Sequence, residues 1–572
     1  MSTHQRSASA TSARLSAEKD QEKESDITST YARKDDHSIA HVKRSMAKDI
    51  VLIGTVTLAM ILNIANMTAV SISLPTIGSD LNIIESMLQW IVSAYSLSSG
   101  CLLSFLGRLA DLFGRKLTFI LGCAWMGIFG LGCGFAQDEI TIDILRALQG
   151  LGPAAASRCE CCFHTHHHQL PHVAHPLQLG ILVHTFPPSH IRSVAFATFA
   201  AGAPVGGALG STVGGVLTQL TAAMCCLGGY ISIEADVPYT LPDKRLDWVG
   251  AFLVTAGLTF IVFILSDGSI APDGWRTGYI IALVIVGVFS LVLFVFWERY
   301  LEQVHMQGGE VSQKWWTPPP LMPVSIWGRA NGKVAAVLVI AFVESLEWCS
   351  FSGFTFWVQL YYQEYLNLSP ILTMVRLLPM QVTGVTCNVV IALIVAHASL
   401  VYLATIGTLF TATANLLFAV IVPSTPYWAF GFPAVVLCVF GADFFFSTGT
   451  LFIARACLPH EQSVGGALFQ TLTQLGTAFG LAISTVVFNA TLRAKERDLG
   501  IGANVEGTNA PREAQLAAYK GAMWSGFAFG VFGMLLAVLF LRGVGVVGHR
   551  KGDTYDESEK PAARGDPKAV RP

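Results

Sequence analysis

The chain has 572 residues, of which 52% are hydrophobic and 13% are charged, and its mean hydropathy is +0.54. Soluble domains carry roughly 25% charged residues, so this composition excludes an ordinary soluble protein and predicts a polytopic protein of the lipid bilayer. The formal net charge is -2, and nothing in this balance points to nucleic acid as a partner.

Both ends of the chain are polar. Residues 1–48 are rich in Ser, Lys and Arg, and residues 548–572 have a similar character, so each segment is predicted to be a disordered tail. Basic segments beside membrane spans favour the cytoplasmic side. We therefore expect both termini in the cytoplasm, which requires an even number of crossings.

Between these tails, apolar runs recur that approach the 20 or so residues of a membrane helix. Thirteen are clear, and a weaker run follows the fifth, so about fourteen spans are predicted. The weak sixth run is short for a crossing, so we expect a truncated span there. The predicted spans are Ile50–Ile72, Met87–Leu106, Leu117–Phe135, a fourth from Ile140 to about Ala156, about Val194–Leu217, the weak Thr221–Ile233, Val249–Leu265, Gly278–Trp297, Ala335–Gln359, Leu372–Ala396, Leu400–Val422, Tyr427–Ile453, Gly465–Phe488 and Met523–Leu541.

A Cys- and His-rich stretch at 157–176 interrupts the fourth span, and apolar sequence resumes at Leu177. Cys and His are preferred zinc ligands, but their spacing here differs from that of a structural zinc site. Three interpretations stay open: a gene-model artefact such as a translated intron, a tolerated loop, and a metal-binding insert. We expect no metal site. The candidate ligands are Cys159, Cys161, Cys162, His164, His166, His167, His168, His172 and His175.

A compact charged motif, GRLADLFGRK, lies between the second and third spans. Its basic residues favour the cytoplasmic side, and its glycines permit a tight turn and close helix contacts. A simple basic loop would share these properties. The motif nevertheless resembles the signature between the second and third helices of the major facilitator superfamily. The resemblance implies transport or gating roles for Gly107, Asp111, Gly114 and Arg115.

Further phrases resemble the fourteen-span drug:proton antiporter branch of that family, most closely its fungal multidrug and aminotriazole-resistance permeases. They include QWIVSAY at the start of the second span, and Arg146 with Gln149 in the fourth. Arg146 is costly at membrane depth and needs a counter-charge or a wet cavity, unless it snorkels to the interface. The resemblance makes Arg146 and Gln149 candidates for proton coupling or substrate contact.

The fifth span carries a glycine framework that resembles the antiporter motif of this branch. Its members are Gly206, Gly210, Gly214 and Gly215, and Ser211 replaces the motif proline. The resemblance implies export, whereas ordinary glycine packing between helices is the alternative.

Acidic residues inside predicted spans are candidate proton or substrate sites, because a carboxyl group is costly in lipid. Glu344 and Glu347 lie in the ninth span and Asp443 in the twelfth, and Arg376 in the tenth could pair with one of them. A hydrogen-bonded structural acid is the alternative for each. In the first span, Asn66 replaces the acid that the branch carries at this point, so it is a weaker candidate.

The resemblance implies the major facilitator fold, two six-helix bundles with two extra central helices. The expected segments are an N-terminal bundle at 49–233, two central helices at 234–297, a cytoplasmic loop at 298–334 and a C-terminal bundle at 335–547. In such folds the substrate site lies near mid-membrane and the halves rock around it.

The expected function is export of small amphipathic or cationic compounds by a monomer in the plasma membrane, with the vacuolar membrane as the alternative. The proton gradient drives it, and we expect no cofactor and no enzymatic activity. Alternatives are transport of amino acids, siderophores or ammonium-like solutes on the same fold, and a transport-inactive membrane protein that arises from a faulty gene model.

Overall fold

The structure is a computed structural model. Contacts divide the chain into two units, Met1–Ile50 and Val51–Pro572, and the packing described below is that of the second. The described residues are 46–84, 87–113, 115–158, 202–210, 220–231, 245–268, 271, 273–307, 314–322, 324–325, 336–394, 398–456, 462–500 and 510–541.

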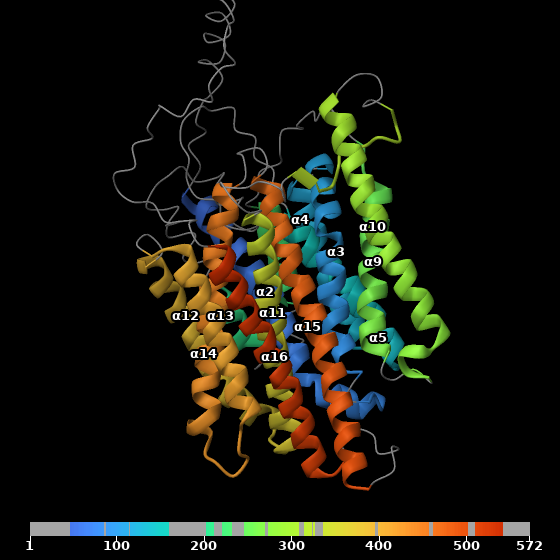
Figure 1. The fold of residues 1–572 in the computed structure, drawn as a ribbon. Coiled ribbons are helices and arrows are strands. Elements are labelled where there is room, and N and C mark those ends of the chain that lie inside the picture. The colour runs from blue at the N-terminus through green and yellow to red at the C-terminus, as the bar shows by residue number, and fades with distance from the viewer. Residues whose placement is uncertain are drawn as a thin grey trace, which may run out of the picture. The chain divides into compact units, whose positions relative to one another are not determined.

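Nearly all of these residues are helical, and the helices run alongside one another (Figure 1). The first half of the chain contains α2 (Met46–Leu81), α3 (Gln89–Phe113), α4 (Arg115–Cys133), α5 (Glu139–Gln149) and α6 (Leu151–Arg158). The central pair consists of α9 (Trp248–Asp267) and α10 (Gly278–Gln307), joined through the 3-10 turn η1 (Gly274–Arg276). The second half contains α11 (Ala336–Leu360), the π-helical turn η4 (Tyr361–Tyr365), α12 (Pro370–Ile394), α13 (Leu400–Ala419), α14 (Tyr427–Ala456), α15 (Gln462–Asp498) and α16 (Arg512–Phe540).

Eleven of the described helices are long and apolar enough to cross a membrane. They correspond to the predicted spans other than the fourth, fifth and sixth. The fifth is described as a helix over 202–210 only, and the sixth is the short apolar helix Leu220–Ile231. Several helices are longer than their predicted spans. In the first half, α2 continues to Leu81 and α3 to Phe113. Later in the chain, α10 continues to Gln307, into the predicted cytoplasmic loop, α15 continues to Asp498, and α16 begins at Arg512. Hydropathy marks only the part of a helix that lies in lipid, so it missed these polar extensions.

The fourth span is divided at Gly150 into α5 and α6. Pro153 has no N–H with which to bond the carbonyl oxygen of Gln149 four residues earlier, so the helix breaks there. A side chain at Gly150 would collide with the backbone of Tyr95 and the hydroxyl of Ser98. The break therefore coincides with a close approach of α3.

Glycines of the fifth span allow it to pack against α2 at backbone distance. A Cβ atom at Gly206 would lie 2.7 Å from the carbonyl oxygen of Ile61, and Gly202 and Gly210 face the same helix. The four-residue spacing places these three glycines on one helix face. Close packing of this kind is common to both interpretations of the glycine framework, the antiporter motif and ordinary helix packing.

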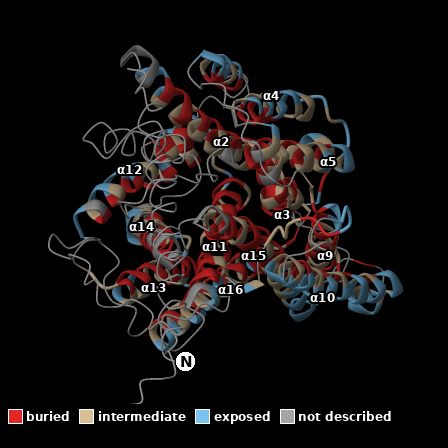
Figure 2. Cartoon of the chain, turned by 90° about the horizontal axis from the view of Figure 1, so that it is seen from above, coloured by how far each residue is buried: buried red, intermediate tan, exposed pale blue. Residues whose placement is uncertain are grey.

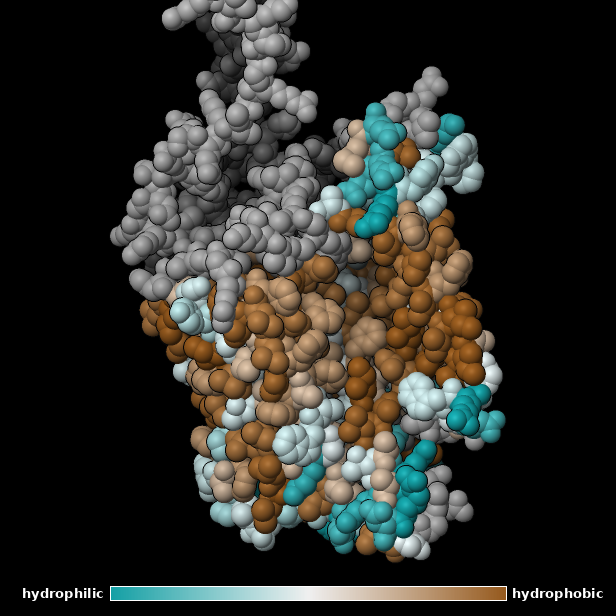
Figure 3. Space-filling view, viewed as in Figure 1, coloured by the Kyte–Doolittle hydropathy of each residue, from teal (hydrophilic) through white to brown (hydrophobic). Residues whose placement is uncertain are grey.

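The central helices attach to the rest of the molecule through α9. Leu258 and Val262 of α9 share an apolar cluster with Cys101 of α3 and Ala478 of α15. In contrast, α10 is mostly exposed at the edge of the assembly (Figure 2). Figure 3 shows apolar side chains over the middle of α9 and α10 and polar ones near the ends, as expected for helices that face lipid.

The two halves share a large apolar cluster at the predicted outer end. It includes Leu74 and Ile91 from the first half and Trp357 from the second. Polar contacts accompany it: Thr485 Oγ1 donates to Gln89 Oε1 at 3.0 Å, and Gln363 Nε2 donates to the carbonyl oxygen of Ile72 at 3.2 Å.

The packing of α15 on α11 gives a stability prediction. A Cβ atom at Gly480 would lie 2.6 Å from the carbonyl oxygen of Cys349, so Gly480→Ala should force the two helices apart and cost about 1–3 kcal/mol. Gly466→Ala in the same helix is the control, because no atom lies within 4 Å of its Cβ position. Heating in detergent followed by size-exclusion chromatography should show earlier loss of the Gly480→Ala variant alone. Equal melting of both variants would contradict this packing.

Candidate translocation site

Arg146 lies on α5 with 1% of its surface exposed. Its Nε donates to the carbonyl oxygen of Ile91 at 2.9 Å, and its Nη1 donates to Gln149 Oε1 at 2.6 Å. The guanidinium carbon also lies 4.5 Å from the centroid of the Tyr95 ring. Neutral acceptors and a π face therefore surround this cation, and within the described part of the chain it forms no ion pair.

Gln149 connects Arg146 to the first span. Its Nε2 donates to Asn66 Oδ1 at 3.1 Å and to the carbonyl oxygen of Met126 at 3.3 Å. Asn66 is buried, and its Nδ2 has no hydrogen-bond partner among the described residues. The structure thus brings together Asn66, Arg146 and Gln149, which the sequence identified in separate motifs.

Two members of this network were not among the predicted site residues. The Tyr95 hydroxyl donates to Asn63 Oδ1 at 2.6 Å, next to the ring that faces Arg146. Asn63 lies three residues before Asn66, on the same face of the apolar first span. This second polar side chain was the signal in the sequence that could have revealed Asn63.

Glu344 and Glu347 lie on α11 and are almost completely buried inside the C-terminal bundle. Glu344 Oε1 accepts hydrogen bonds from Trp348 Nε1 at 2.7 Å and Thr473 Oγ1 at 3.2 Å. Glu347 Oε1 accepts a hydrogen bond from the Thr411 hydroxyl of α13. The other carboxyl oxygen of each has no partner among the described residues.

Asp443 has different surroundings from the two glutamates. It lies half-buried on α14, and within the described residues its carboxyl group accepts no hydrogen bond and forms no ion pair. Its Oδ2 lies 3.7 Å from the Cβ position of Gly384 on α12, and Pro204 of the fifth span lies 3.4 Å from that same position. Asp443 is therefore the predicted acid that lies next to the first half of the molecule.

The charged motif is described only in part. Gly107 is buried in α3, whereas Gly114 and the side chains of Asp111 and Arg115 lie outside what the structure describes. Lys116, the last residue of the motif, donates from Nζ to the carbonyl oxygen of Tyr230 at 2.6 Å. The end of the motif thus contacts the short sixth helix.

Other predicted positions also lie outside the described residues. They are Gly214, Gly215 and Ser211 of the fifth span, and residues 159–176 of the Cys- and His-rich stretch. Gly206 and Gly210 are described and lie against α2. The neighbouring Gly207 lies in close contact with the side-chain amide of Gln381 on α12.

The suggested pairing of Arg376 with an intramembrane acid is wrong for the described residues. Arg376 lies near the predicted outer end of α12, where its guanidinium carbon is 5.2 Å from the Tyr362 ring centroid and 5.6 Å from that of Tyr427. Its position in the second turn of α12 explains this, because Glu344, Glu347 and Asp443 all lie farther toward the inner half of their helices.

Comparisons with known proteins agree with this architecture. The pattern of the Major Facilitator Superfamily matches residues 56–157 and 268–481. The chain is 24% identical to MFS-type transporter 1 of Pyricularia oryzae, in an alignment that covers 89% of this chain and 86% of that protein. It is 25% identical to the efflux pump terJ of Aspergillus terreus, with 88% and 90% covered. It is 26% identical to the low affinity ammonium transporter of Saccharomyces cerevisiae, with 70% and 73% covered.

A solved structure supports the fold. A bacterial homologue of the human lysosomal transporter Spinster aligns with a TM-score of 0.55 at 14% identity, over 87% of this chain and 97% of that chain. The predicted all-helical major facilitator fold is therefore confirmed. Since the family pattern matches more than half of the chain, this protein belongs to the major facilitator superfamily and is an integral membrane transporter, not an enzyme.

Proposed function

We propose that this transporter exports small amphipathic or cationic compounds in exchange for protons, by alternating access between its two halves. The observation that carries the proposal is the position of Asp443, a half-buried carboxyl group without a described partner, beside Gly384 and Pro204 where the halves adjoin. The similarity to an efflux pump supports the direction of transport.

The physical basis is competition for one carboxyl group. A carboxylate without a partner is costly inside a membrane, so it must take up a proton or a cationic group. Binding of one excludes the other, and movement of the halves would expose the site to each side in turn. Arg146 on the opposite half is held by neutral acceptors, so it does not neutralise Asp443.

The two glutamates fit a structural role better. Each is buried within one bundle and accepts a hydrogen bond from a neighbouring helix or turn. A protonated carboxyl group in this setting joins helices without taking part in exchange. We therefore place Asp443 first among the three predicted acids, and keep Glu347 as the second candidate because its partner Thr411 is a single hydroxyl.

Uptake or release of ammonium-like solutes is a second candidate function, supported by the similarity to an ammonium transporter. A carboxyl group would bind ammonium as it binds an organic cation. Flux in proteoliposomes separates the two functions: export requires that an imposed proton gradient drive an amphipathic cation outward. If the chain as written transports neither class, a transport-inactive membrane protein is the better description.

We also propose that the monomer works in the plasma membrane with both termini in the cytoplasm. The basic motif that ends at Lys116 favours the cytoplasmic side for the connection between α3 and α4. This orientation places η4 and the start of α12 on the outer side.

Removal of the Asp443 charge tests the assignment. Asp443→Asn should reduce proton-driven efflux by at least about tenfold, because the amide can no longer alternate between a proton and a cation. The measurement is the initial efflux rate of a fluorescent cation from proteoliposomes with an imposed pH gradient.

Glu344→Gln provides the matched control, since a glutamine oxygen still accepts from Trp348 and Thr473. Its efflux should stay within about twofold of the wild type. If Asp443→Asn transports normally while Glu347→Gln does not, Asp443 is the wrong residue and Glu347 carries the exchange.

Asn66→Asp tests the network around Arg146. The carboxylate keeps the bond from Gln149, removes a buried donor that has no described partner, and adds a negative charge near a buried cation. We expect the apparent melting temperature to rise, by an amount equivalent to about 1–2 kcal/mol. Asn66→Leu should lower it, because Gln149 loses an acceptor. A drop for both variants would contradict the prediction and show that the position tolerates no added negative charge.

A further inference from the structure

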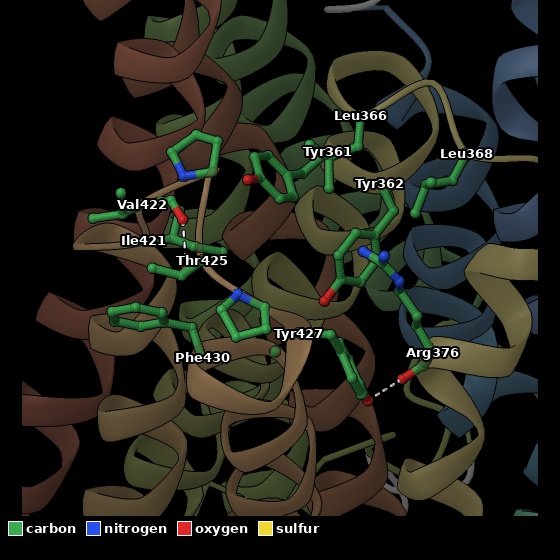
Figure 4. A pocket seen from close by; sticks show the side chains of 13 residues that line it. Tyr361, Tyr362, Leu366, Leu368, Arg376, Ile421, Val422, Thr425, Tyr427 and Phe430 are labelled. Atoms are coloured by element: carbon green, nitrogen blue, oxygen red, sulfur yellow. Dashed lines mark hydrogen bonds between the residues drawn. The ribbon is translucent and has the colours of Figure 1, made fainter.

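A cavity of about 270 Å³ lies at the predicted outer end of the C-terminal bundle (Figure 4). It is lined by η4, the first turns of α12, the connection between α13 and α14, and the first turns of α14. The cavity is distinct from the surroundings of Asp443, because neither Asp443 nor its neighbours Gly384 and Pro204 line it. Its polar lining comes chiefly from Tyr361, Tyr362, Arg376 and Tyr427.

Arg376 brings a positive charge to this cavity. Its guanidinium lies between the rings of Tyr362 and Tyr427, and within the described residues it has no hydrogen-bond acceptor and no acidic partner. The Tyr427 hydroxyl donates to the backbone carbonyl oxygen of Arg376 at 2.6 Å and so fixes one of these rings. The N–H groups of Arg376 therefore remain available to a ligand.

Two buried hydroxyl groups point to the same space. Tyr361 and Tyr362 are each 2% exposed, and among the described residues neither hydroxyl has a hydrogen-bond partner. Figure 4 shows both hydroxyls directed toward the segment that runs from Ile421 to Tyr427. Buried hydroxyls are normally hydrogen-bonded, so two unpartnered ones beside an unpaired cation require an explanation.

We propose that this cavity is a binding site for an anionic oxygen group, the carboxylate of a small aromatic solute or the phosphate of a lipid headgroup. Arg376 would hold the anion through charge-assisted hydrogen bonds, and the tyrosine hydroxyls would donate to it. The side chains of Leu366, Ile421 and Phe430 would cover an apolar body.

A cationic ligand fits this site poorly. Aromatic rings alone could form a cage for a cation, but here Arg376 already occupies the faces of Tyr362 and Tyr427 and would repel a second positive charge. The site therefore differs in ligand charge from the proposed transport substrate, and it stands whether or not Asp443 performs exchange.

Binding of benzoate to the purified full-length protein tests the proposal. The protein is placed in phosphatidylcholine nanodiscs, and calorimetry compares benzoate with benzyl alcohol and benzylamine. Benzoate should bind saturably and the other two should not. Arg376→Gln should weaken benzoate binding by at least about tenfold, and Tyr362→Phe severalfold with its ring retained.

Arg512→Gln is the matched control. Arg512 also lies at this end and stacks on a tyrosine, 5.3 Å from the Tyr365 centroid, but it donates to the Tyr365 carbonyl oxygen and does not line the cavity. It should bind benzoate as the wild type does. Absence of saturable benzoate binding, equal binding of benzyl alcohol, or unchanged affinity in both Arg376→Gln and Tyr362→Phe would overturn the proposal.

Nanodiscs that also contain phosphatidylglycerol separate the two ligand sources. If a lipid phosphate occupies the site, the anionic lipid should weaken benzoate binding to the wild type severalfold and leave the residual binding of Arg376→Gln unchanged. If benzoate affinity is the same in both bilayers, the ligand is a soluble carboxylate.

Discussion

A guanidinium buried among membrane helices must find its acceptors inside the protein, because lipid supplies none. Arg146 meets this requirement without a carboxylate, through the Ile91 carbonyl oxygen, the Gln149 side chain and the Tyr95 ring. These partners lie on α3 and α5, and Gln149 extends the network to Asn66 on α2. The network of this one charge therefore joins α2, α3 and α5, and α3 also approaches the chain closely at Gly150, directly after Gln149.

The second half differs from the first, because its buried ionisable side chains inside the bundle are acids. Glu344 accepts a hydrogen bond from Thr473 of α15 and Glu347 accepts one from Thr411 of α13, which joins α11 to both helices. Asp443 lies instead toward α12 and the fifth span. The two halves thus differ: one holds a buried cation bound by neutral acceptors, and the other holds buried acids, of which Asp443 is the proposed site of exchange.

The sequence predicted the fold class and most spans, because each long apolar run corresponds to one helix. It also predicted that Arg146 needs compensation, but not that neutral groups would supply it, since the carbonyl of Ile91 becomes available only through the packing of α3 on α5. Periodicity could not separate Asp443 from Glu347, because their difference lies in which neighbouring helix each faces. Arg376 was misassigned for a similar reason: depth along α12, rather than charge, decides its partners.

The outer end of the molecule joins two of these features through η4. Gln363 of this turn donates to Ile72 of the first half, whereas its neighbours Tyr361 and Tyr362 line the outer cavity. A π-helical turn is locally wider than an α-helix and is often found at functional positions. The proposed alternating access requires the apolar contact at this end to separate. The proposed anion site and the contact of Gln363 with the first half share the five residues of this turn, so a ligand bound to the two tyrosines would bear on the same turn that joins the halves.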